Sequence, residues 1–66
     1  MSELTNTENI VYKLLVEGFT VTDIVKLMNV KESTVRSHLK NIFTKKEVSS
    51  QQELIVLHYR GKVRNG

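Results

Sequence analysis

The segment from residue 31 to residue 46 combines an apolar stripe with all of the chain's net positive charge. Val35, Leu39, Ile42 and Phe43 follow the i, i+4, i+7 and i+8 spacing of a helix that packs one face on a core. The segment holds five basic residues and one acidic residue, whereas the other fifty positions hold five basic and six acidic residues. The net charge of +3 therefore comes entirely from this one predicted helix.

A basic helix with one apolar face can read a DNA groove, lie on a membrane surface or be an ordinary solvated helix, so its neighbours decide. Just before it, a capping box at Thr20 to Asp23 opens a short apolar helix, and Asn29 is suited to the turn that follows. A short helix, a tight turn and a longer basic helix form the helix-turn-helix pattern. In that pattern the second helix usually lies in the DNA major groove.

Two further helices flank this pair. A capping box at Thr5 to Glu8 opens the first one, and Gly18 supplies the left-handed residue that commonly ends a helix. A third capping box, Ser50 to Glu53, opens a last helix that is apolar on most sides. A helix of that kind is buried on most sides, which favours pairing with its own copy in a second subunit.

The expected fold is therefore all-α, with four helices in one domain over residues 1–66. Residues 1–4 are expected to form a loose arm and residues 61–66 a flexible basic tail. Because the chain has no cysteine, its stability has to come from helix packing, with or without a partner subunit. The four helices are expected at residues 6–17, 21–28, 32–46 and 51–60.

Several classes of function are disfavoured. No apolar run approaches the roughly 18 residues of a membrane span, so we expect a cytoplasmic protein without a membrane partner, associated with the nucleoid when bound to DNA. His38 and His58, with no cysteine, make a poor metal site, and no cofactor is expected. No spacing of serine, histidine and aspartate suggests a nucleophile held beside a base, so we expect no enzyme.

An ordered set of residues runs through the chain at unbroken spacing: Leu4, Thr5, Glu8, Val11, Leu14, Leu15, Gly18, Ile24, Glu32, Thr34, Val35, His38, Asn41, Ile42, Lys45, Val48 and Glu53. With these residues the chain resembles the LuxR-type (GerE-like) helix-turn-helix domain over residues 4–57. The resemblance implies a bacterial transcriptional regulator whose third helix lies in the major groove and whose fourth helix forms a two-fold dimer. The chain departs from the family pattern at Lys31, usually a capping serine, and at Lys46 and Glu47, usually leucine and glycine.

The resemblance places base-reading residues at Arg36, Ser37 and Lys40. Arg36 can fork onto guanine O6 and N7, Lys40 can reach the next acceptor one turn later, and Ser37 should discriminate least. Phosphate contacts would position this helix without reading sequence. The candidates for those contacts are Thr22, Lys31, Ser33, Thr34, Lys45 and Lys46.

The predicted function is sequence-specific binding of double-stranded DNA by a homodimer, with Leu54, Leu57 and His58 in the dimer interface. RNA polymerase or another regulator is a further candidate partner. The alternative is a protein-interaction module that pairs with another helix-turn-helix regulator and modulates it. Arg36 and Lys40 disfavour that alternative, because a module that only pairs has no need of a basic third helix. A sigma-factor segment shares the motif, but the fourth helix favours self-pairing.

Overall fold

The computed structural model describes residues 3–63, and over that range it contains four helices and no strand, which confirms the all-α prediction. The helices are α1 (Asn6–Val16), α2 (Val21–Met28), α3 (Glu32–Lys46) and α4 (Gln51–Val63). The bounds of α2 and α3 agree with the prediction, and α1 ends one residue earlier than predicted. The α4 helix ends at Val63, three residues later than predicted, and so extends into the predicted tail. Residues 1–2 and 64–66 of the predicted arm and tail lie outside the described residues.

Local side-chain signals open the first two helices as predicted. At α1 the Thr5 hydroxyl accepts from the Glu8 N–H at 3.1 Å, and the Glu8 carboxylate accepts from the Thr5 N–H at 3.0 Å. At α2 Thr20 and Asp23 exchange the same two bonds at 3.2 and 3.0 Å. Each box satisfies backbone donors that a helix start otherwise leaves unpaired.

The predicted capping box at the start of α4 is only half right. The Ser50 hydroxyl accepts from the Glu53 N–H at 3.2 Å, as a cap should. The Glu53 carboxylate, however, accepts from the backbone N–H and the hydroxyl of Ser49, at 2.6 and 2.8 Å. The Glu53 carboxylate thus binds one residue earlier in the chain than the predicted box requires.

Left-handed residues end the first three helices. Gly18 has a φ of 98°, and the bonds Gly18 N–H to Leu15 and Phe19 N–H to Leu14 complete a Schellman motif. Asn29 has a φ of 56°, as its place in the turn predicted. Glu47 adopts a φ of 58° after α3, at the position where the family pattern usually has glycine. A side chain in this region costs free energy that glycine does not.

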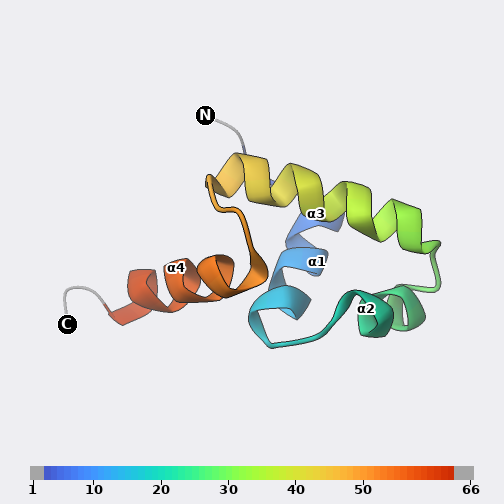
Figure 1. Ribbon diagram of the computed structural model, residues 1–66, viewed down its shortest axis with the longest axis horizontal. Helices are drawn as coiled ribbons and strands as arrows, with labels where there is room; N and C mark the ends of the chain where they lie inside the picture. Colours follow the sequence, from blue (N-terminus) through green and yellow to red (C-terminus); the bar gives the residue numbers. More distant parts are fainter. Residues whose placement is uncertain (1–2, 64–66) are drawn as a thin grey trace.

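The core is made by all four helices. In Figure 1, α3 lies along one side of the molecule, α1 and α2 lie against it, and the far end of α4 projects away. The α4 helix packs on α1, and the Gln51 amide secures its start by donating to the carbonyls of Leu15 and Phe19 at 2.9 and 3.1 Å. No helix within residues 3–63 is long and apolar enough to cross a membrane. The buried core residues are Val11, Leu15, Val16, Ile24, Val35, Ile42 and Leu54.

Candidate nucleic-acid interface

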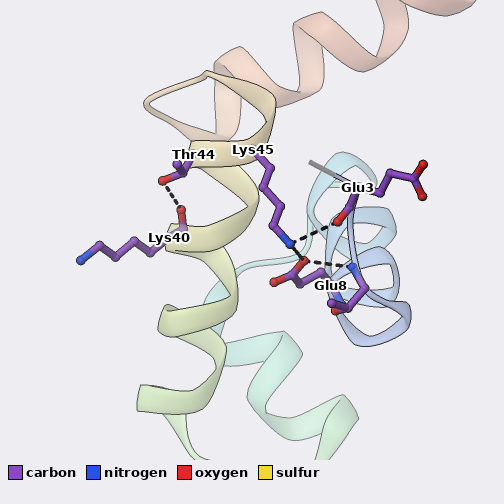
Figure 2. Close-up of polar contacts among 6 residues, drawn as sticks. Glu3, Glu8, Lys40, Thr44 and Lys45 are labelled. Atoms are coloured by element: carbon purple, nitrogen blue, oxygen red, sulfur yellow. Dashed lines mark hydrogen bonds and ion pairs between the residues drawn. The ribbon is translucent and has the colours of Figure 1, made fainter. Parts of the chain in front are cut away.

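The two sides of α3 differ as the sequence pattern predicted. Val35 and Ile42 are fully buried against the other helices. On the opposite side the predicted base-reading residues Arg36, Ser37 and Lys40 are all exposed, and the structure brings them together on one face. Figure 2 shows the Lys40 ammonium pointing away from α1 into open space. The helix therefore presents hydrogen-bond donors outward while its apolar side holds it in place.

Arg36 has a partner within its own helix. Its Nε donates to Glu32 Oε2 at 2.7 Å, and its Nη2 lies 2.7 Å from the same oxygen. The side chains of Arg36 and Glu32 are 65% and 59% exposed, so water screens the pair. No functional role was predicted for Glu32, although its i, i+4 spacing to Arg36 is a recognised signal for such a pair.

The start of α3 carries the next group of candidates. Lys31, Ser33 and Thr34 are exposed there, and Thr22 is exposed in the first turn of α2. Lys31 holds the N-cap position, and no side chain of the described residues caps this helix start. Uncapped backbone N–H groups and the positive end of the helix dipole suit a phosphate.

Lys45 lies on the inner side of α3, and its ammonium is held by the protein itself. The Nζ atom is 2.7 Å from Glu8 Oε1 and 3.2 Å from the Glu3 carbonyl oxygen, and Figure 2 shows the side chain reaching across to α1. The Lys45 ammonium lowers the pKa of the Glu8 carboxyl, and the Thr5 N–H acts in the same direction. Because Glu8 is only 4% exposed, its carboxylate needs this partner. This pairing disfavours the predicted phosphate contact at Lys45.

Lys46 is also turned toward α1. It is half-buried, and its Nζ lies 5.2 Å from the centre of the Tyr12 ring, within the range of a cation–π contact. Of the six predicted phosphate contacts, four are therefore exposed on the α2 and α3 surface, and two face α1.

A sequence model of the family described as bacterial regulatory proteins, luxR family (GerE), matches residues 2–58. The chain belongs to the LuxR family. This result confirms the resemblance drawn from the sequence. It makes the chain a helix-turn-helix DNA-binding regulator, and DNA its partner. A comparison with curated proteins gives no match.

In the fourth helix of this LuxR-family domain, the structure corrects the prediction for one interface residue. Leu54 is fully buried in the chain's own core, so it cannot contact a second subunit, and that prediction is wrong. Leu57 is 43% exposed, and it has two exposed apolar neighbours that the sequence reasoning did not single out, Val56 and Tyr59. These three side chains, which spread over the outward half of α4 with Val56 between the other two, are here together called the α4 apolar face. His58 is half-buried beside it, with Nδ1 2.7 Å from the Tyr12 hydroxyl.

The described part of this LuxR-family chain offers no built metal site. Within residues 3–63, no three His, Cys, Asp or Glu side chains lie close enough together to hold a metal ion. The candidate interface thus consists of exposed side chains and backbone groups on α2 and α3.

Proposed function

We propose that the chain regulates transcription by binding a specific DNA sequence as a dimer, with α3 in the major groove and α4 at the dimer interface. The observation that carries this proposal is the outward basic face of α3, which lies opposite the fully buried Val35 and Ile42. Membership of the LuxR family supports DNA as the ligand. A rigid helix whose exposed side chains are donors matches the acceptors on guanine in the major groove.

Arg36, Ser37 and Lys40 are the proposed base-reading residues. A guanidinium can donate to guanine O6 and N7 at once, so Arg36 should contribute most to discrimination. Lys40 stands one turn further along α3 and can reach the acceptors of the next base pairs. Ser37 carries a short hydroxyl that both donates and accepts, so it should discriminate least.

The proposed phosphate contacts are Thr22, Lys31, Ser33 and Thr34, together with the uncapped N–H groups at the start of α3. Contacts of this kind fix the register of a helix on the duplex but carry no sequence information. Lys45 and Lys46 are left out because their ammonium groups face Glu8 and Tyr12 of the same chain.

Two copies are proposed to pair through the α4 apolar face. Val56, Leu57 and Tyr59 are each about half exposed, and burying such side chains against a copy removes apolar surface from water. A two-fold dimer would bring its two α3 helices to half-sites about one helical turn apart, roughly 34–36 Å. His58, also proposed at this interface, would lie at its edge, because Tyr12 holds the ring against α1.

The same α4 apolar face favours a second candidate, a module that pairs with another helix-turn-helix regulator. RNA polymerase is a further candidate partner under either proposal. This candidate ranks second because a module that only pairs through α4 leaves the exposed Arg36 and Lys40 of α3 without a role.

Selection from random-sequence duplex DNA, carried out at two salt concentrations, tests the proposal. The expected result is an enriched palindrome with a steep salt dependence, because phosphate contacts release counterions. The Arg36→Ala variant should lose the enrichment at one base pair in each half-site. Weak binding without any enriched sequence would overturn the DNA-reading proposal and favour the interaction module.

A further inference from the structure

We infer that Glu32 is a positioning residue that sets how strictly Arg36 reads its base. This inference rests on the proposed function, in which Arg36 contacts guanine. It starts from the single carboxylate oxygen, Glu32 Oε2, that lies 2.7 Å from both Nε and Nη2 of Arg36.

The pairing occupies only one edge of the guanidinium. Arginine has five N–H donors in a planar fork. Glu32 takes the side edge, formed by Nε and Nη2, so the two hydrogens on Nη1 and the second hydrogen on Nη2 are not used by this pair. The second Nη2 hydrogen and one Nη1 hydrogen form the end edge, and guanine O6 and N7 accept two parallel bonds of the kind that this edge can donate. Arg36 can therefore keep Glu32 while it binds guanine.

The backbone fixes where Glu32 stands. Glu32, Arg36 and Lys40 are spaced four residues apart, so they form one row along the exposed side of α3. Glu32 lies in the first turn of the helix, where a carboxylate also suits the helix dipole. An exposed pair of this kind contributes little to folding. The role inferred for it is to bias the side-chain conformations of Arg36 toward the paired one.

An arginine with restricted side-chain conformations should discriminate guanine from other bases more strongly than an unrestrained arginine does. An unrestrained guanidinium can swing to a phosphate, which is present at every position of the duplex and carries no sequence information. Glu32 counters this because its oxygen holds the side edge of Arg36. Losing this restraint should lower discrimination at the guanine about threefold to tenfold, the scale of ordering one long side chain.

The test is a double-mutant cycle in which the measured quantity is the discrimination between two DNA duplexes. Affinities are measured for the selected operator and for the same duplex changed at the base pair that Arg36→Ala relaxes, and their ratio is taken. Glu32→Gln should lower that ratio in the wild-type chain and leave it unchanged in the Arg36→Ala chain. Glu17→Gln, which removes an exposed carboxylate at the end of α1, is the matched charge control and should leave the ratio unchanged.

Three results would overturn the inference. If Glu32→Gln changes the affinity for all duplexes by one factor, Glu32 acts only as a charge. If it lowers the ratio equally in the Arg36→Ala chain, Glu32 contacts a base itself. If Arg36→Ala relaxes no base pair, Arg36 is not a reader, and the proposed role of Arg36 falls together with the inference. Circular dichroism of each variant verifies that α3 remains folded.

Discussion

The Nζ atom of Lys45 lies 2.7 Å from Oε1 of Glu8 and joins the last turn of α3 to the first turn of α1. The same carboxylate oxygen accepts from the Thr5 N–H at 3.0 Å, so one atom serves both the cap of α1 and the end of α3. The pair is largely shielded, with side-chain exposures of 25% for Lys45 and 5% for Glu8. Removing either partner leaves a shielded charge without its counterion.

Lys45→Ala should therefore lower the melting temperature and urea midpoint, because the Glu8 carboxylate loses its partner. The comparison is Lys13→Ala, which removes an exposed lysine from α1 and should have a much smaller effect. Thermal and urea unfolding measure both variants. Equal stability, combined with weaker binding to all DNA sequences, would instead return Lys45 to the phosphate contacts.

Stability should fall in acid, because the Lys45 ammonium and then the Thr5 N–H lower the pKa of Glu8 relative to the unfolded chain. A lowered pKa means that the stabilisation is complete above the unfolded pKa and is lost as the pH falls through the folded one. Backbone N–H donors lower the pKa of Asp23 and Glu53 in the same way. Urea midpoints should therefore begin to decrease at about pH 5. Glu8→Gln should flatten that decrease, whereas a decrease that Glu8→Gln leaves unchanged would exclude Glu8 as its source.

Glu47→Gly should stabilise the fold by about 0.5–1 kcal/mol, after allowing for the greater freedom of glycine in the unfolded chain. Its φ of 58° is strained for a residue with a side chain. Asn29→Gly is the control, because asparagine tolerates the left-handed region better and should gain less at its similar φ of 56°. Urea unfolding measures both gains, and destabilisation by Glu47→Gly would mean that the glutamate side chain contributes more than the strain costs.

Arg36→Ala and Lys31→Ala should weaken DNA binding in different ways. Arg36→Ala should cost on the order of 1–3 kcal/mol at the operator and relax discrimination at one base pair. Lys31→Ala should weaken binding to every sequence and reduce the slope of log K against log salt by about 0.9. Titrations of operator and random duplexes at several salt concentrations separate the two. Identical behaviour would show that the division between readers and phosphate contacts is wrong.

Leu57→Glu should shift a dimer to monomer while it preserves the helical content, because Leu57 is exposed and a buried charge is costly at an apolar interface. Leu27→Glu is the matched control, since Leu27 is an exposed leucine on α2, 60% accessible and outside the proposed interface. Sedimentation and circular dichroism measure the two variants. A wild-type chain that sediments as a monomer at all concentrations, or a Leu57→Glu variant that still dimerises, would contradict the proposed pairing.

The starts and ends of α1 and α2 were predictable because their signals are local. Thr5 with Glu8, and Gly18 before Phe19, act within a few residues of chain. The inward turn of Lys45 was not predictable, because its partner Glu8 stands 37 residues away in the sequence. Lys40 and Lys45 were both predicted to lie on the exposed basic surface, although about 140° of rotation around the helix axis separates them.

The fourth helix shows a different limit. Its central residues are apolar almost all the way round, so periodicity does not distinguish an inner side from an outer side. Only packing on α1 decides that Leu54 is fully buried and that Leu57 is partly exposed. The Glu32–Arg36 pair was predictable from its i, i+4 spacing. Functional roles were nevertheless predicted only for the basic residues of this helix.

The two bonds from the Gln51 amide, to Leu15 in the last turn of α1 and to Phe19 just after this helix, have a consequence for the spacing of the DNA half-sites. In the proposed dimer, α4 belongs to the interface and α3 to the half-site, so the angle between α4 and the body determines how far apart two α3 helices stand. Gln51 fixes the first turn of α4 against α1, and in this way it fixes that angle. The bases within a half-site would then be specified on α3, whereas the number of base pairs between half-sites would be specified where α4 meets α1.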